Sequence, residues 1–237
     1  EGPAVYDDEA EVVNLTDVDG ATVTLYAKWN INTYSVRFFD HTGTVQISET
    51  QTVSWGSAAA PVTPPVRTGY TFTGWTLTGD DDTVETSLTN VRENIDAVAD
   101  YEPITYYVRY DSNGGEGTMA DSTHVYDAFS TLTPNGFTRE GHTFAGWATT
   151  PDGPVVYENG ASVSNLASEN DAIVTLYAQW NINTYSVRFF DYTGTVQIGE
   201  TQIISWGGAA TPVTPPARTG FTFTGWTLTG DDDTVET

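Results

Sequence analysis

Two tryptophans lie in loop-like sequence, where an aromatic ring is well placed to stack on a sugar. Trp55 and Trp206 each stand in the tripeptide Ser-Trp-Gly, directly before an alanine-rich loop that contains proline. An indole offers a large apolar face together with an N–H donor. We therefore treat Trp55 and Trp206 as candidate ligand-binding residues, with a glycan as the ligand. The alternative is that each ring covers the core of its own domain.

Two runs of three aspartates, at residues 80–82 and 231–233, carry carboxylates of the kind that Ca²⁺ prefers. Neither run has the alternating ligands, central glycine and terminal glutamate of an EF-hand. We expect both runs to be solvated loop tips, and the sequence predicts no metal site.

Residues for covalent or acid–base catalysis do not gather in a recognisable motif. The chain has no cysteine, and its three histidines are spread along it at His41, His124 and His142. It contains no G-x-S-x-G, no H-E-x-x-H and no glycine-rich phosphate loop followed by lysine. We expect no catalytic residue, no cofactor and no enzymatic activity.

Acidic side chains dominate the composition, with 32 acidic residues against 8 basic ones and a formal net charge of −24. Such a surface repels nucleic-acid phosphates and anionic lipid headgroups, so binding to either is not expected. No apolar run approaches the roughly 20 residues of a membrane-spanning helix, so membrane insertion is not expected. A cationic partner, or simply a soluble and self-repelling surface, fits this composition.

The sequence segments that must position these side chains are repeated along the chain. Residues 1–86 align with residues 152–237 at a constant offset of 151, without a gap. Near-identity at a long period is typical of a tandem array. The sequence therefore predicts several small domains that belong to a longer series.

Each period contains two kinds of unit, which we name first-type and second-type repeats. Both open with a tyrosine-rich strand pattern, pass through the motif G-x-T-F-x-G-W and close on another strand pattern. The predicted parts are residues 1–30 (the C-terminal part of a first-type repeat), 31–103 (a second-type repeat), 104–181 (a complete first-type repeat) and 182–237 (the N-terminal part of a second-type repeat).

Six of the seven arginines occupy recurring positions in these repeats. One set falls in the first strand and the other just before G-x-T-F-x-G-W. Because a guanidinium group bonds carboxylates and carbonyls well, we expect each arginine to bond such groups within its own repeat. The alternative is that the arginines bind an anionic ligand. The six are Arg37, Arg67, Arg109, Arg139, Arg188 and Arg218.

The side-chain alternation is that of β-strands. Tyr34, Val36 and Phe38 recur at a period of two, and Asn-Gly and proline-rich stretches mark turns. Helical patterns are sparse, with one or two turns predicted at residues 87–95 and 161–166. We predict a mainly β (α+β) chain with at most one short helix in each repeat. The aromatic residues of G-x-T-F-x-G-W are expected in the core, where its glycines allow close backbone approach.

Successive repeats are joined with almost no spacer. Residues 29–34 and 180–185 pass from the end of one repeat to the first strand of the next, and neither is a flexible Gly/Ser linker. We expect restricted angles between repeats and an elongated rod on the order of 100 Å long. Trp29 and Trp180 stand at these junctions and are expected to pack against the next repeat.

The motifs YDSNGGEGTM, NGFTREGHTFAGW and VTLYAQW in residues 109–180 resemble the Listeria–Bacteroides repeat, the B-repeat of internalin B and many other bacterial surface proteins. The second-type repeats resemble a divergent branch in which Asp-His-Thr-Gly at residues 40–43 replaces the Asn-Gly-Gly turn. The resemblance implies small β-grasp-like domains behind an adhesive or enzymatic head in secreted or wall-attached proteins. It carries over no catalytic residue.

Together these features predict a stalk segment of a secreted or cell-wall-attached bacterial surface protein, which acts as a semi-rigid spacer and also in adhesion. Its partners would be the adjacent repeats of the same chain and a host-surface glycan or protein. The alternative is a carbohydrate- or host-protein-binding module, in which repetition converts weak affinity into avidity.

Overall fold

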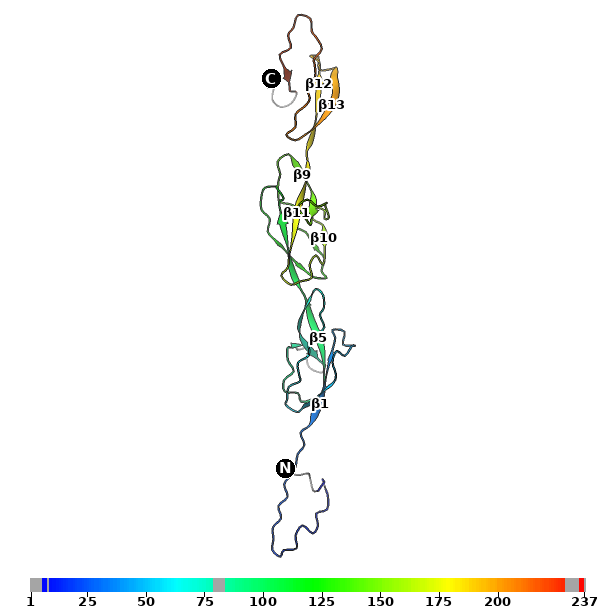
Figure 1. Ribbon diagram of the computed structural model, residues 1–237, viewed down its shortest axis with the longest axis vertical. Coiled ribbons are helices and arrows are strands. Elements are labelled where there is room, and N and C mark those ends of the chain that lie inside the picture. The colour runs from blue at the N-terminus through cyan, green and yellow to red at the C-terminus, as the bar shows by residue number, and fades with distance from the viewer. Residues whose placement is uncertain (1–5, 8, 79–83, 229–234, 237) are drawn as a thin grey trace. The chain divides into compact units, whose positions relative to one another are not determined.

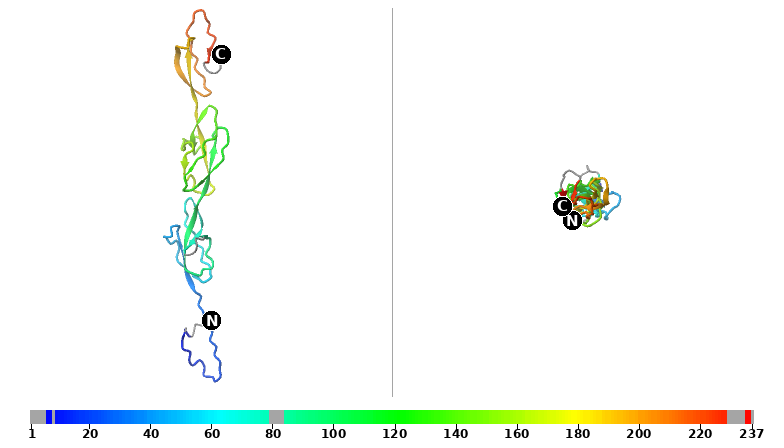
Figure 2. Two further views of the ribbon diagram at one scale, coloured as in Figure 1. Left: turned by 180° about the vertical axis from the view of Figure 1, so that it is seen from behind. Right: turned by 90° about the horizontal axis from the view of Figure 1, so that it is seen from above.

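The computed structural model describes residues 6, 7, 9–78, 84–228 and 235–236. These residues form 15 strands and no helix, and no coiled ribbon is drawn in any view of them (Figures 1 and 2). The chain divides into two compact units, residues 1–102 and 103–237.

A five-stranded sheet forms the second-type repeat of the first unit. Its strands are β1 (Thr33–Phe39), β2 (Gln51–Ser54), β3 (Tyr70–Leu77), β4 (Val84–Glu85) and β5 (Ile95–Pro103). The order across the sheet is β2-β1-β5-β3-β4. β1 pairs antiparallel with β2 and parallel with β5, so the first and last strands of the repeat lie side by side (Figure 1).

The inward side chains of this sheet build one apolar core. Val36 and Phe38 of β1 are fully buried, and the Phe38 ring meets Trp75 edge-on at a centroid distance of 4.8 Å. Ala97 and Ala99 belong to the same core and alternate along β5. Trp75 of G-x-T-F-x-G-W therefore lies in the core, which confirms the prediction for that motif.

The complete first-type repeat has the same central arrangement. Its strands are β6 (Thr105–Asp111), β7 (Ser122–Val125), β8 (Ser130–Thr131), β9 (His142–Ala148), β10 (Ser162–Val163) and β11 (Ile173–Ile182). The main sheet has the order β7-β6-β11-β9, and β8 pairs with β10. β11 runs parallel to β6 on one side and antiparallel to β9 on the other.

Trp147 is the centre of the first-type core. Its side chain is completely buried and lies between Tyr110 and Phe144, whose ring centres are each 4.9 Å from its own. The glycine before it is needed for space: a Cβ on Gly146 would lie 2.8 Å from the Tyr157 carbonyl oxygen. The predicted close backbone approach at this motif is confirmed.

The turn after the first strand is held by an aspartate carboxylate in both repeat types. In the second type, the Asp40 carboxylate accepts hydrogen bonds from the hydroxyl of Thr42 (2.7 Å) and from its amide (3.2 Å), and Gly43 has a φ of 69°. In the first type, the Asp111 carboxylate accepts from the Asn113 amide at 2.8 Å. The second-type turn thus forms without the Asn-Gly-Gly sequence, and the aspartate bonds the amide two residues later in both types.

The N-terminal half repeat forms no strand over residues 9–31. Leu25 is 55% exposed, whereas Leu176, its counterpart in the complete repeat, is fully buried.

The C-terminal half repeat forms two separate hairpins. They consist of β12 (Thr184–Phe190) with β13 (Gln197–Ser205), and of β14 (Trp226–Thr227) with β15 (Val235–Glu236). In the preceding second-type repeat, β5 joins the corresponding strands β1 and β3 into one sheet.

The predicted helices at residues 87–95 and 161–166 are wrong. Residues 87–94 are irregular, and Ser162–Val163 is the short strand β10. The α+β assignment fails for the same reason within the described residues, which are all strand or loop. Tertiary contacts override the weak local signal here: Val91 donates its amide to Ser57 and accepts from Gly56, which holds the segment as an extended cover over the sheet.

Candidate functional site

Trp55 stands on the first turn after β2, with its amide donated to the Asn32 carbonyl at 2.8 Å. The next residue, Gly56, has a φ of 76° and donates its amide to Val91 at 2.7 Å. The indole is 48% exposed, and the Arg92 guanidinium carbon lies 4.8 Å from its ring centre. Trp55 is therefore a half-exposed loop residue, and the guanidinium group of Arg92 from the same repeat lies over its ring.

Trp206 occupies the same place in the last repeat. Its amide is donated to the Asn183 carbonyl at 2.8 Å, and its side chain is 50% exposed. The five-membered ring lies directly against Gly141 of the preceding first-type repeat, so that a methyl group on Gly141 would overlap it. Trp55 and Trp206 belong to different units.

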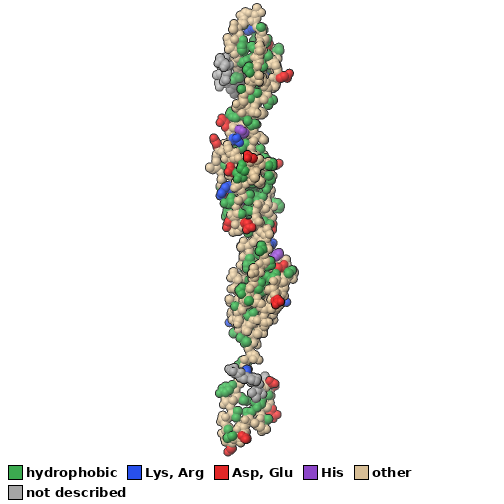
Figure 3. All heavy atoms as spheres, in the orientation of Figure 1, with side chains coloured by type: hydrophobic (Ala, Val, Ile, Leu, Met, Phe, Trp, Pro, Cys, Tyr) green, Lys and Arg blue, Asp and Glu red, His purple; other side chains and the backbone are tan. Residues whose placement is uncertain are grey.

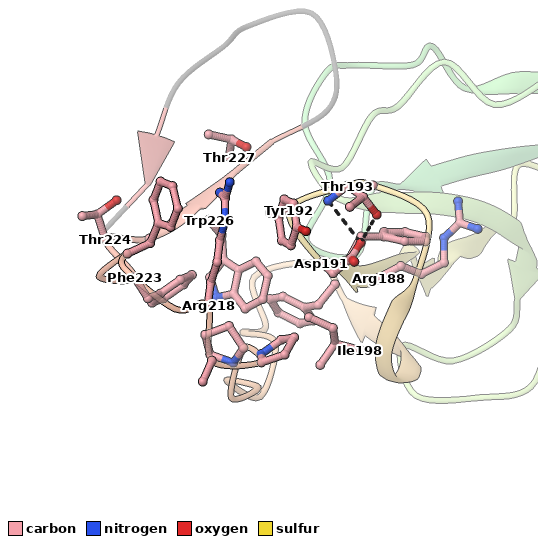
Figure 4. Close-up of a pocket in the computed structure, with 18 of the residues that line it drawn as sticks. Arg188, Asp191, Tyr192, Thr193, Ile198, Arg218, Phe223, Thr224, Trp226 and Thr227 are labelled. Atoms are coloured by element: carbon pink, nitrogen blue, oxygen red, sulfur yellow. Dashed lines mark hydrogen bonds between the residues drawn. The ribbon is translucent and has the colours of Figure 1, made fainter.

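A groove of about 830 Å³ opens in the last repeat, between the two hairpins (Figure 4). Val187, Phe189 and Trp226 line it, and the Arg218 side chain stands beside Tyr192 at 4.1 Å from the ring centre. Phe223 on its wall is 53% exposed.

This groove is the place that β5 fills in the preceding second-type repeat. Val36, Phe38 and Trp75, which correspond to Val187, Phe189 and Trp226, have exposures of 0, 2 and 3% beneath the complete sheet. The groove thus has the shape of an open sheet position.

The arginines of the first strand bind carboxylates of their own repeat, which confirms the structural interpretation for two of them. Arg37 makes a forked contact with Asp96 at 2.6 and 2.5 Å, which raises the pKa of the guanidinium group through the hydrogen bond and the charge of Asp96. Arg109 makes a similar fork with Asp121 at 3.3 and 2.9 Å. Arg188, in the half repeat, lies over Phe190.

The arginines before G-x-T-F-x-G-W lie over aromatic rings in the second-type repeats. The Arg67 guanidinium carbon is 3.5 Å from the centre of the Tyr70 ring, and Arg218 lies 3.6 Å from that of Phe221. Both contacts are cation–π interactions that fix the strand entry. These contacts explain why arginine recurs at this position in the second-type repeats, and no ligand is needed for the explanation.

His124 is a buried polar residue that the sequence did not reveal. It is 2% exposed, its ring stacks on Tyr106 at 5.4 Å, and its nitrogens bond the hydroxyls of Ser122 (2.8 Å) and Ser130. Burial lowers the pKa of His124 below the usual value of 6.5, which favours the neutral ring. A signal was available in the serines two residues before and six residues after it.

Trp180 packs within its own repeat, so the prediction that it contacts the next repeat is wrong. Its indole N–H is donated to the Ser112 carbonyl at 3.0 Å, and its ring meets Phe144 at 5.7 Å. A Cβ on Gly115 would lie 2.8 Å from Trp180, so the Asn-Gly-Gly turn makes room for this ring.

Carboxylates do not cluster into a metal site within the residues that the structure describes. No group of three or more metal-ligating side chains occurs among them, and acidic side chains are scattered over the visible face (Figure 3). The aspartates at residues 80–82 and 231–233 lie outside the described residues. Hydrogen bonding to Thr42 and Thr193 lowers the pKa of Asp40 and of Asp191, so both turn carboxylates favour the ionised form.

Two solved structures are similar to this chain. Domains 3–4 of the Streptococcal High Identity Repeats in Tandem (SHIRT) of a cell surface protein are 18% identical, with a TM-score of 0.22, and cover 63% of this chain and 98% of that one. Mub-RV is 12% identical, with a TM-score of 0.16, and covers 62% of this chain and 97% of that one.

Relatives with similar sequences are longer proteins. A protein of Evansella cellulosilytica that is provisionally named a membrane protein is 33% identical over 208 residues, which are 86% of this chain and 29% of the relative. Internalin H of Listeria monocytogenes is 32% identical over 93 residues, which are 39% of this chain and 15% of the relative. The chain thus spans less than a third of either relative. Within its described part, no helix has the length and hydropathy needed to cross a bilayer.

The sequence also matches the profile of a domain family three times, at residues 34–99, 106–179 and 185–236. Each match begins within a first strand, β1, β6 or β12, and the matches together cover most of the chain. The three matched segments are therefore copies of one domain, and the chain belongs to the Listeria–Bacteroides repeat domain family.

Proposed function

We propose that this chain is a stalk segment that acts as a semi-rigid spacer in a bacterial surface protein. The observation that carries the proposal is the junction inside the second unit. β11 ends at Ile182 and β12 begins at Thr184, so one residue separates two repeats. A junction this short cannot act as a flexible tether.

Hydrogen bonds across that junction support the same proposal. The Asn183 amide is donated to the Gly141 carbonyl at 2.8 Å, and the Thr143 hydroxyl is donated to the Asn183 side chain at 2.6 Å. These bonds tie the single connecting residue to the body of the first-type repeat. Mutual repulsion within a chain of net charge −24 would further oppose folding of the array onto itself.

The proposal also covers the location of the protein and the fold of its repeats. Membership of the repeat family and the internalin relative support a secreted or cell-wall-attached bacterial protein. We propose β-grasp-like repeats without the helix, because the first and last strands lie parallel at the centre of each complete sheet. The repeats would be non-enzymatic, with residues 1–30, 31–103, 104–181 and 182–237 as the parts of the array.

Small-angle scattering tests the spacer function. We expect a maximum dimension on the order of 100 Å, from a series of domains each roughly 30 Å across. A radius of gyration near the about 18 Å of a compact chain of this length would contradict the proposal.

Carbohydrate or host-protein binding is the second candidate function, and the half-exposed rings of Trp55 and Trp206 favour it. Repetition along an array would raise a weak affinity. Binding to a glycan array should then fall in Trp55→Ala and Trp206→Ala without a change in melting temperature. Trp29→Ala is the matched control, because Trp29 is 88% exposed outside these loops. Equal binding by all variants would reject the role of the loop tryptophans.

A further inference from the structure

We propose that the loop tryptophan of a second-type repeat is a clasp that packs on the glycine turn of the preceding first-type repeat. In this chain the clasp consists of Trp206 and the turn at residues 139–142. The proposal rests on the spacer function, for which the clasp supplies the contact that limits bending at the junction.

The contact between Trp206 and Gly141 is close enough to exclude any side chain at that glycine. A Cβ placed on Gly141 would overlap Cγ, Cδ1 and Nε1 of Trp206, all atoms of the five-membered ring. Gly141 also has a φ of 66°, in the left-handed region that favours glycine. Two independent requirements, backbone conformation and space for the indole, therefore fall on this one residue.

The backbone places the ring where it can make this contact. Asn183 donates its amide to Gly141 and accepts the amide of Trp206, both at 2.8 Å. One residue of the connection thus holds the turn of one repeat and the loop of the next. The indole adds an apolar contact with Gly141 to these hydrogen bonds.

The equivalent turn of the last repeat has no indole against it. Gly220 has a φ of 82°, but nothing lies within 4 Å of the position that its Cβ would occupy. The two turns share the backbone conformation and differ in whether an indole covers them.

The other copy of the loop shows a second neighbour for the ring. In the complete second-type repeat, Arg92 lies 4.8 Å from the Trp55 ring centre. A loop tryptophan in a complete second-type repeat that follows a first-type repeat would contact both an arginine and a glycine turn. A sugar stacked on the ring would compete with these contacts. The test must therefore distinguish glycan binding by Trp206 from the clasp.

The test measures how widely the two repeats of the second unit move relative to each other. The chain has no cysteine, so Asp152→Cys and Thr214→Cys, both at exposed positions, place one spin label on each repeat of the full 237-residue chain. Pulsed spin-label measurements then give the distribution of distances between the labels. We expect a narrow distribution in the parent, broadened about twofold by Trp206→Ala, because a junction without an extensive interface moves by default.

A matched pair of glycine variants isolates the contact from the backbone strain. Gly141→Ala and Gly220→Ala both introduce a Cβ at positive φ, but only Gly141→Ala displaces an indole. We expect Gly141→Ala to broaden the distribution and Gly220→Ala to leave it unchanged. Gly141→Ala added to Trp206→Ala should cause no further broadening. This comparison keeps Trp206 in place, so it decides the matter even if Trp206→Ala unfolds the last repeat.

The outcomes separate the clasp from the spacer function. A narrow parent distribution that Trp206→Ala and Gly141→Ala leave unchanged would overturn the clasp and leave the spacer standing. A parent distribution as broad as that of a flexible linker would overturn both. Loss of glycan binding in Trp206→Ala at an unchanged width would overturn the clasp in favour of the second candidate function.

Discussion

His124 illustrates how one buried side chain can make a repeat sensitive to acid. It stacks on Tyr106 and bonds the hydroxyls of two serines, and burial lowers the pKa of the imidazole. A histidine with a lowered pKa is neutral in the folded repeat, whereas the unfolded chain takes up a proton near pH 6.5. The stabilisation from the neutral ring is therefore complete above pH 6.5 and is lost as the pH falls toward the folded-state pKa.

We predict that His124→Phe makes the stability of the first-type repeat less dependent on pH. Phenylalanine keeps the stacking on Tyr106 but cannot be protonated. Melting temperatures between pH 7.5 and pH 5 should fall more steeply in the wild type than in the variant. Asp40 and Asp191 serve as an internal reference, because carboxylates with a lowered pKa lose their contribution only at more acid pH. Parallel pH profiles for the two proteins would refute the role of His124.

At the scale of secondary-structure elements, the approach of Val155 and Tyr157 to β9 depends on one glycine. A Cβ on Gly146 would lie 2.5 Å from Val155 Cγ1 and 2.8 Å from the Tyr157 carbonyl oxygen, and the φ of 140° disfavours other residues. The isolated bridge between Trp147 and Tyr157 would have to open to admit a methyl group.

We predict that Gly146→Ala destabilises the first-type repeat by about 1–3 kcal/mol through overpacking. Gly160→Ala in the same repeat is the control, since Gly160 also has positive φ but nothing lies within 4 Å of its Cβ position. Hydrogen exchange of the β9 and β11 amides localises the effect within the chain. Equal protection in the two variants would show that close packing at Gly146 contributes nothing.

The open groove of the last repeat leads to a second prediction at this scale. Adding a copy of residues 87–103 after residue 237 should place a strand between β12 and β14, as β5 lies between β1 and β3. Burial of Phe223 and Trp226 would stabilise the last repeat by about 1.5–3 kcal/mol for each ring that becomes fully buried.

The measurement for this extension is the tryptophan fluorescence, which should shift to the blue as Trp226 leaves water. In the control, the added copy carries aspartate in place of the two alanines that correspond to Ala97 and Ala99, which are buried in the intact sheet. A shift of the same size with the control segment would contradict insertion into the sheet.

At the scale of the whole molecule, charge is the dominant property. A net charge of −24 on 237 residues destabilises every folded repeat through repulsion among carboxylates. The attractive pairs that the structure describes, Arg37 with Asp96 and Arg109 with Asp121, are largely exposed and so offset little of it.

We predict that the melting temperature rises when NaCl is increased from about 0.01 M to 0.5 M, because the screening length falls from about 30 Å to below 10 Å. A calorimetric scan at each salt concentration checks this. Sucrose at matched osmolality controls for general exclusion of solutes from the surface. A melting temperature that falls with added NaCl would mean that attractive ion pairs outweigh the repulsion.

The sequence by itself determined the repeats, their strand character, the core role of G-x-T-F-x-G-W and the use of Arg37 and Arg109 within their own repeats. The strand character and the core role are local properties, because a period of two fixes which side chains face the core, and the repeats are visible as a copy at offset 151. The helices at residues 87–95 and 161–166 failed because hydrogen bonds to distant loops outweigh a weak local propensity.

Only the tertiary structure decided which distant strands pair and where the tryptophans lie. β1 meets β5 in parallel across an intervening 55 residues, and no pattern in either strand specifies that neighbour. Trp180 lies near the end of β11 and fills its own repeat, whereas Trp206 follows β13 and contacts Gly141 of the preceding repeat. Strand direction and the space above a glycine set the position of each ring, and both arise only when the chain has folded.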